Sequence, residues 1–145
     1  MSKLDAIIRD LKKVEDREDR AYHFNELGIL LGRMGDARAI QCFENACRLT
    51  RYAGRKMRVL GRLGDAYCLL KLDWDRAKKF YLACIAVGDR GNCNPLHVWE
   101  ARFRLDDLEA DRRGENREFE EMRGTIIING DSNAAVVGKL EIPSL

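Results

Sequence analysis

Apolar residues recur along this chain at the three- and four-residue spacing of α-helices. The first such set is Leu4, Ile7, Ile8, Leu11 and Val14, and Ser2 stands before it as a capping residue. Four further helices are predicted over about 19–34, 36–52, 56–72 and 73–88, with Asp36 as the N-cap of the second of these. A Gly or an Asp marks each change of helix, with Gly54 and Gly88 expected at helix ends.

Two of the predicted helix pairs repeat one pattern of large and small residues. The first copy is Phe24, Leu27, Gly28 and Leu31, followed by Ala39, Phe43 and Ala46; the second is Leu60, Leu63, Gly64 and Tyr67, followed by Ala77, Tyr81 and Cys84. Gly28 and Gly64 are expected where the two helices of a pair cross, since a side chain there would force the helices apart. Such pairs bury their apolar faces by stacking on one another.

This pattern resembles the tetratricopeptide repeat, W-x2-L-G-x2-Y…A-x3-F…P. The resemblance covers residues 20–88, although the Gly-to-Ala spacing differs between the two units and neither unit ends in Pro. It implies an all-α fold, an antiparallel helix-pair solenoid of about two full repeats plus capping helices. Proteins of this class usually bind another molecule in a concave groove.

A degenerate third unit is expected after Pro95, because Trp99 stands where a repeat would begin. Its first helix would carry the apolar residues Leu96, Trp99, Phe103, Leu105 and Leu108. A shorter charged helix would follow Gly114 and continue through Met122. The predicted helical repeat domain therefore covers residues 1–123.

Residues 124–145 have a different character, that of a β-prone tail. Ile126, Ile127 and Ile128 precede an Asn129-Gly130 turn signal, and Val136 and Val137 follow it. This predicts a short C-terminal β-hairpin-like tail. An isolated two-stranded ribbon is marginal in water, so the tail is expected to pack on the helices, on a partner, or on a second copy to give a homo-oligomer.

Composition narrows the class of protein. The chain has 145 residues, 46% of them hydrophobic, which is enough for a continuous core, and its formal net charge of +2 does not favour nucleic acid or membranes overall. Neither a signal-type apolar region nor a long apolar run appears, so a soluble, cytoplasmic protein is expected. The five cysteines match no zinc or redox spacing, which predicts packing thiols and no metal, with Cys93 the accessible one.

The resemblance also implies which residues face the groove, namely Tyr22, Asn25, Ile29 and Arg33 in the first unit and Arg58, Arg62 and Asp65 in the second. Arg58 and Arg62 lie four apart on one helix face, where two guanidinium groups can bind a carboxylate. The Lys/Asn/Arg clamp of peptide-binding relatives is not reproduced, because Asn25 stands beside the expected places and Asp65 stands where an amide or a cation is used. A protein or peptide partner is expected, with an acidic segment as one alternative.

A basic stretch over residues 48–62 supports an alternative function. Its cations are Arg48, Arg51, Arg55, Lys56, Arg58 and Arg62, and Tyr52 lies among them. Nucleic acid would favour such a patch if these side chains shared one face. The stretch spans a helix end and a loop, however, and cations there also stabilise the helix C-terminus.

Catalysis finds little support in the sequence. His23 and His97 have no partner at metal-ligand or catalytic spacing, and the glycines are explained by packing and caps rather than by phosphate binding. No catalytic residue, cofactor or metal is predicted. The predicted function is a non-enzymatic adaptor or scaffold that binds a partner segment in the groove, and nucleic-acid binding is the alternative.

Overall fold

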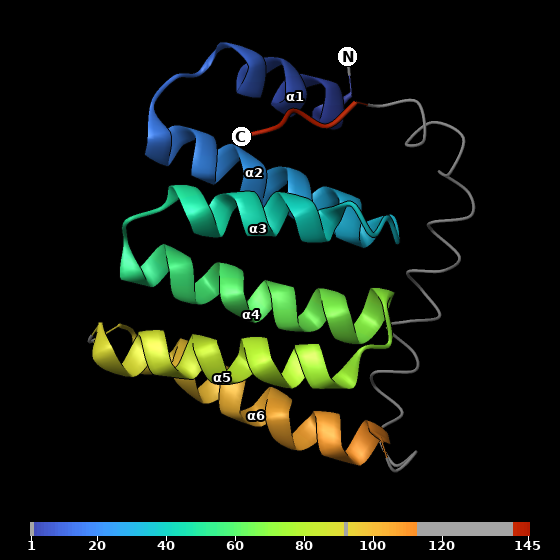
Figure 1. Ribbon diagram of the computed structural model, residues 1–145, viewed down its shortest axis with the longest axis vertical. Helices are drawn as coiled ribbons and strands as arrows, with labels where there is room; N and C mark the ends of the chain where they lie inside the picture. Colours follow the sequence, from blue (N-terminus) through green and yellow to red (C-terminus); the bar gives the residue numbers. More distant parts are fainter. Residues whose placement is uncertain (1, 92, 113–140) are drawn as a thin grey trace.

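The computed structural model describes residues 2–91, 93–112 and 141–145, and this part of the chain is all-helical. Its helices are α1 Lys3–Lys13, α2 Arg17–Arg33, α3 Ala39–Leu49, α4 Ala53–Leu70, α5 Trp74–Arg90 and α6 Pro95–Arg112. Consecutive helices run in opposite directions and pack side by side in chain order (Figure 1). The all-α prediction is confirmed for the described residues.

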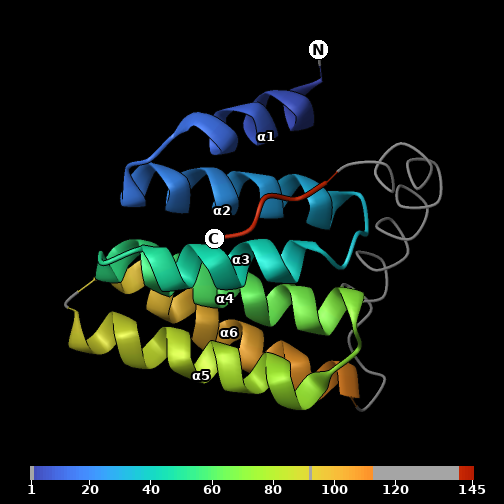
Figure 2. The ribbon, with the colours of Figure 1, turned by 45° about the horizontal axis from the view of Figure 1, so that its top comes forward.

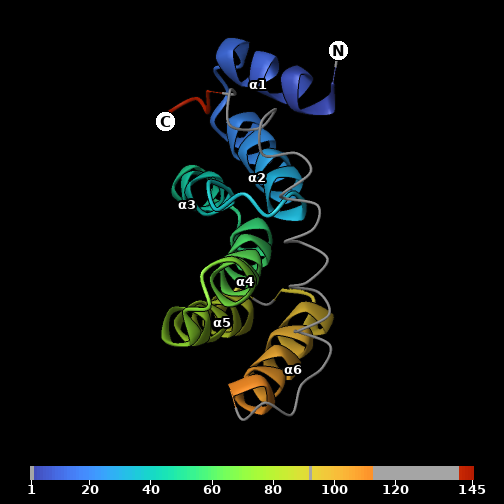
Figure 3. The ribbon, with the colours of Figure 1, turned by 90° about the vertical axis from the view of Figure 1, so that its right-hand side faces the viewer.

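The helices form two layers, which are seen end-on in Figure 3. One layer contains α2, α4 and α6, which contact one another in that order, and the other contains α3 and α5. Helix α1 covers the end of the stack beside α2, which is the one described helix that it contacts. Because each pair of helices is joined by a short turn, neighbours in sequence are also neighbours in space.

Side-chain caps explain where several helices begin. Ser2 Oγ accepts a hydrogen bond from the Asp5 amide at 3.1 Å, as the sequence predicts. The side chain of Asp73 accepts one from the Arg76 amide at 3.0 Å. These caps satisfy amides that have no partner within the helix.

The predicted helix crossings are confirmed in both pairs. A Cβ added to Gly28 would lie 2.6 Å from Cε1 of Phe43, and a Cβ added to Gly64 would lie 2.6 Å from Cε1 of Tyr81. Each glycine therefore allows an aromatic ring of the following helix to pack directly on the main chain. A continuous core runs from Leu4 through all six helices to Leu108.

Two predicted helix boundaries are wrong, at Asp36 and Gly54, whereas α5 ends at Arg90, near Gly88 as predicted. Asp36 does not cap α3 directly, because its carboxylate accepts from the Arg38 amide at 2.9 Å in a turn that precedes Ala39. Gly54 lies in the first turn of α4, where an added Cβ would meet nothing within 4 Å. Gly88 is a buried packing position inside α5, where a Cβ would lie 2.5 Å from Val98.

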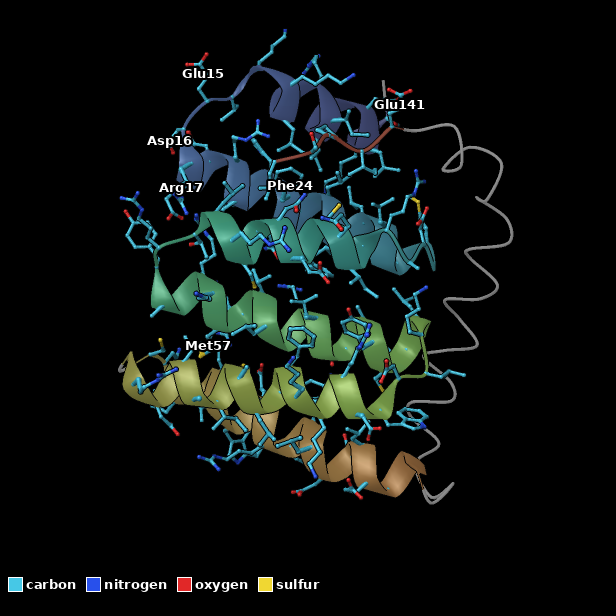
Figure 4. All side chains as sticks on the ribbon, viewed as in Figure 1. Glu15, Asp16, Arg17, Phe24, Met57 and Glu141 are labelled. Atoms are coloured by element: carbon cyan, nitrogen blue, oxygen red, sulfur yellow. The ribbon has the colours of Figure 1, made fainter. Side chains whose placement is uncertain are left out.

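Gly88 also explains how α6 is oriented. Val98 packs against it beside Met57, which Figure 4 shows between α4 and α5. Val98, Ala101 and Leu108 are consequently the buried residues of α6. Of the five apolar residues that the sequence places on this helix, Leu96, Trp99 and Phe103 are exposed.

Of the predicted β-prone tail, the structure describes residues 141–145. This segment is extended, forms no strand, and lies beside α1 and α2 (Figures 1 and 2). Ile126, Ile127, Ile128, Val136 and Val137 lie outside the described residues, as does the helix expected through Met122. The division into 1–123 and 124–145 therefore remains a prediction.

Candidate binding groove

A cavity of about 570 Å³ opens between α4, α5 and α6. We call it the α4–α6 cavity. Helix α4 contributes Met57, Arg58, Gly61, Arg62 and Asp65, α5 contributes Tyr81 and Cys84, and α6 contributes His97, Trp99, Glu100, Ala101, Phe103 and Arg104. Its size falls within the range of small-ligand and peptide pockets, and charged and aromatic side chains are both present.

The predicted groove residues of α4 meet in this cavity. Arg58 is exposed, whereas Arg62 is half-buried and its Nε has no hydrogen-bond partner among the described residues. Neither side chain forms an ion pair within that part of the chain. Burial lowers the pKa of the Arg62 guanidinium, and the charges of Arg58 and Arg33 lower it further, while Asp65 and Glu26 oppose them. A bound anion next to Arg58 and Arg62, in addition to Asp65, would offset the repulsion between their two positive charges.

Asp65 forms a polar couple with Tyr81 at one side of the cavity. The Tyr81 hydroxyl donates a short hydrogen bond to Asp65 Oδ1, and Arg104 Nε lies 3.8 Å from the same oxygen. Burial raises the pKa of the Asp65 carboxyl, although the Tyr81 hydrogen bond and the charges of Arg104 and Arg62 oppose that rise. Burial also raises the pKa of the Tyr81 phenol, and the Asp65 charge adds to the effect. Tyr81 therefore stays protonated and acts as a fixed donor.

Two aromatic side chains of α6 form the outer wall of the cavity. Trp99 is 62% exposed and Phe103 is 51% exposed, and their rings stack with centroids 5.7 Å apart. Single exposed aromatic residues are normal on a protein surface, but two stacked rings form a contiguous apolar patch. The wall offers an apolar surface next to the two arginines.

The four predicted groove residues of α2 do not line this cavity. Tyr22 and Arg33 are exposed, and Ile29 is partly buried against the core. Asn25 is half-buried. Its Oδ1 is buried and has no hydrogen-bond partner among the described residues. Helix α2 nevertheless contacts α4. The charge of its Glu26 raises the pKa of Arg62, and the charge of its Arg33 lowers it. The structure thus brings Arg58, Arg62 and Asp65 together and places the α2 residues on the adjoining helix.

The basic stretch over residues 48–62 does not form one surface. Arg55 pairs with the Glu18 carboxylate at 2.7 Å, so an acidic side chain of α2 neutralises one of these cations. Arg58 and Arg62 line the cavity, while the side chains of Arg48, Arg51 and Lys56 are exposed near the turn between α3 and α4. The stretch therefore supplies two separate sets of cations.

The cysteines and histidines give no sign of a reactive centre. Burial raises the pKa of the Cys42 thiol to about 12 and those of Cys47 and Cys84 to about 11, so these thiols stay protonated at neutral pH. Within the described ranges the five cysteines are free, and no cluster of three His, Cys, Asp or Glu side chains has the arrangement of a metal site. Among the described helices, none is both long and apolar enough to cross a membrane.

Sequence reasoning missed the contribution of α6 to this site. Trp99 and Phe103 were placed on the first helix of a degenerate third unit without a binding role, and Arg104 was assigned no role. The spacing of the two aromatic residues was nevertheless informative, because residues four apart share a helix face. Tyr81 was predicted as a packing residue, which is correct for its ring but omits its hydroxyl.

Comparisons with models of known protein families, with curated proteins and with solved structures found no match to this chain. The class that the structure itself defines is an all-helical stack with an open cavity between three of its helices.

Proposed function

We propose that this chain is a non-enzymatic adaptor or scaffold, a tetratricopeptide-like helix-pair solenoid that binds a segment of a partner protein in the α4–α6 cavity. The observation that carries the proposal is the pairing of Arg58 and Arg62 with the exposed rings of Trp99 and Phe103 around one opening. Arginine and aromatic side chains are enriched where proteins bind each other.

The repeat assignment is supported by the matched crossings of the two helix pairs. In each pair a glycine of the first helix receives an aromatic ring of the second, with the same 2.6 Å separation from an added Cβ. In a solenoid of this type the first helices of successive pairs line the groove. Helices α2, α4 and α6, which form one layer, would be those helices.

The chemistry of the cavity favours a partner segment with acidic and apolar residues close together. A carboxylate beside Arg58 and Arg62 would accept charge-assisted hydrogen bonds, each of which contributes about 1.5–3 kcal/mol. An apolar side chain on the wall of Trp99 and Phe103 would add about 25 cal/mol for each Å² that it covers. Asp65 and Glu100 oppose a third carboxylate, so the acidic residues of the partner should lie toward Arg58.

We propose no catalytic role for the cavity. Asp65 and Tyr81 are its strongly perturbed acids, but the hydrogen bond between them gives both groups a structural role. The Cys84 thiol is held protonated by burial, which removes the obvious nucleophile.

The predicted tail completes the proposal. Ile126, Ile127, Ile128, Val136 and Val137 would mediate self-association or docking, on the argument that a β-prone ribbon needs a partner for its edges. Nucleic-acid binding remains the alternative function, although the division of the basic stretch between the cavity and the α3–α4 turn weakens it.

The test uses a short fluorescein-labelled peptide with acidic residues on either side of a leucine–phenylalanine pair. Fluorescence anisotropy should show binding to the full chain. The same peptide with amides in place of its carboxylates, or with serines in place of its apolar pair, should bind about tenfold more weakly, as the loss of one charged hydrogen bond or of the apolar contact predicts.

Three variants of the full chain separate the cavity from the rest of the basic stretch. R58E and R62Q should each weaken binding of the acidic peptide about tenfold. K56E is the matched control, because Lys56 is an exposed cation of the same helix that does not line the cavity. Equal losses in K56E and R58E would contradict the proposal, and tighter binding of an oligouridine probe than of the peptide would favour the alternative.

A further inference from the structure

Residues 141–145 form a second structured contact, at the opposite end of the stack from α6. The segment lies beside α1 and α2 on the side of the stack where α3 lies (Figures 1 and 3), and Figure 4 shows Glu141 next to α1. Ile142 packs against the core, and Pro143 is half-buried. The contact is therefore made mainly by one apolar side chain and by the main chain around it.

Arg20 holds this segment and the end of α1 together. Its guanidinium donates to the carbonyl oxygens of Leu11 at 2.6 Å, Val14 at 3.1 Å and Ser144 at 3.1 Å. Its Cζ also lies 5.6 Å from the centre of the Phe24 ring. Of these three acceptors only Ser144 O belongs to the segment, and it is a main-chain oxygen, so Arg20 contacts the backbone of the segment and not one of its side chains. Selectivity must come from the apolar contact of Ile142.

Helix α1 depends on few other contacts. Among the described helices it touches α2 and no other, whereas α3 and α5 each pack between two neighbours. Two of the three carbonyls that Arg20 binds belong to the end of α1 and the residue after it. Loss of the segment would remove one of the few contacts that hold α1 on the stack.

We propose that the surface of α1 and α2 around Arg20 is a binding site for an extended segment with an apolar residue, and that residues 141–145 of the same chain are its resident ligand. We call this surface the Arg20 site. It is separate from the α4–α6 cavity and involves none of the residues assigned to it. The proposal also uses none of the residues to which self-association was assigned, which are Ile126, Ile127, Ile128, Val136 and Val137.

Chain length favours binding within one molecule. Residues 113–140 join α6 to the segment and can span about 90 Å when extended. Helices packed 8–10 Å apart make a stack of six at most about 50 Å long. A tethered ligand of this kind has an effective concentration of about 1 mM, which far exceeds ordinary concentrations of a second copy. The segment should therefore close the Arg20 site in each monomer.

The first test compares two full-chain variants by amide hydrogen exchange. I142D places a charge at the buried contact, and exchange in α1 should become about tenfold faster because an apolar contact that holds the helix is lost. Exchange in α4 and α5 should not change. L145D is the matched control, because Leu145 is 52% exposed and the same charge there should leave α1 unaffected. Equal exchange in the two variants would overturn the proposal.

The second test asks whether the site recognises its ligand. A peptide of residues 139–145, added at about 1 mM to the I142D chain, should restore slow exchange in α1. The same peptide with aspartate at the isoleucine position should not restore it. Rescue by both peptides, or by neither, would overturn the proposal.

The third test is the solution mass of the natural chain and of I142D. Monomers in both cases, or dimers in both cases, agree with closure within one molecule, and the second result would attribute dimerisation to other residues. A dimer that I142D converts to monomer would place the segment on a second copy and overturn the proposal. Failure of the Arg20 site can thus be distinguished from failure of the proposed tail association.

Discussion

The two helix pairs, α2–α3 and α4–α5, cross in the same way but differ in polar chemistry beside the crossing. In the first pair Gly28 is followed by Ile29 and receives Phe43. In the second pair Gly64 is followed by Asp65 and receives Tyr81, whose hydroxyl binds that carboxylate. Ile29 and Phe43 of the first helix pair thus correspond to the hydrogen-bonded Asp65 and Tyr81 of the second. The α4–α6 cavity is lined by Asp65 and Tyr81.

This difference shows which positions packing determines. A ring lying directly on the main chain excludes every residue but glycine, so Gly28 and Gly64 are set by the fold. The next residue and the ring hydroxyl face away from that contact and are free to serve another purpose. The two pairs also differ in their carboxylates and in their turns, and each difference can be tested.

The largest effect is expected from filling the crossings. G28A and G64A each place a Cβ 2.6 Å from a buried ring, and overpacking of this kind costs about 1–3 kcal/mol of the free energy of unfolding. G61A is the control, because its Cβ would meet only the Cys84 sulfur at 3.6 Å, and alanine stabilises a helix interior by up to about 1 kcal/mol relative to glycine. The free energy of unfolding can be measured by urea denaturation. If G64A changed it as little as G61A while G28A lowered it, the two crossings would not be equivalent.

A smaller effect, of opposite sign in the two pairs, is expected from pH. Burial alone would raise the pKa of Glu18, but hydrogen bonds from the Arg51 amide and the Thr50 hydroxyl, together with Arg55, hold it below its ordinary value of 4.5. Glu18 therefore stabilises the fold above pH 4.5, and this contribution is lost as the pH falls through the lower folded pKa. The pKa of Asp65 is raised, so its contribution is greatest below the ordinary value of 3.8 and declines as the pH rises through the folded pKa.

Denaturation of E18Q and D65N between pH 3 and 7 checks these signs. E18Q should be about 1–2 kcal/mol less stable than the natural chain at pH 7, and the gap should narrow in acid. D65N should gain stability relative to the natural chain as the pH rises. Parallel pH profiles for the two variants would contradict the assigned shifts.

The smallest effect is expected at the turns within the two pairs. Gly35 follows α2 with a φ of 75°, and Leu72 follows α4 with a φ of 53°, a left-handed conformation that disfavours a side chain. L72G should stabilise the chain by about 0.5–1 kcal/mol, and G35A should destabilise it by about 1 kcal/mol. Thermal denaturation should show shifts in opposite directions, and a loss of stability in L72G would mean that the exposed leucine makes a needed contact.

The helices and crossings could be predicted because they depend on local periodicity and on the need for glycine under a ring. The helix end at Gly54 could not, since a glycine can also lie inside a helix. The buried face of α6 could not be chosen from the sequence, because two sets of its residues have helical spacing and the contact of Val98 with Gly88 selects between them.

The candidate site was predicted in part for a similar reason. Arg58, Arg62 and Asp65 follow from the repeat pattern on one helix. Trp99, Phe103 and Arg104 belong to a helix whose orientation depends on tertiary contacts, so no local pattern placed them beside the arginines. The Arg20 site joins residues from both ends of the chain and left no local signal.

The measurement that tests the central claim most directly is a map of amide chemical shifts as the acidic leucine–phenylalanine peptide is added to the full chain. The largest shifts should fall on the cavity-lining turns of α4 and α6, around Arg58, Arg62, Trp99 and Phe103. Shifts concentrated on α3 and α5, or around Arg48 and Arg51 at the α3–α4 turn, would contradict that claim, and so would the absence of any shift at saturating peptide.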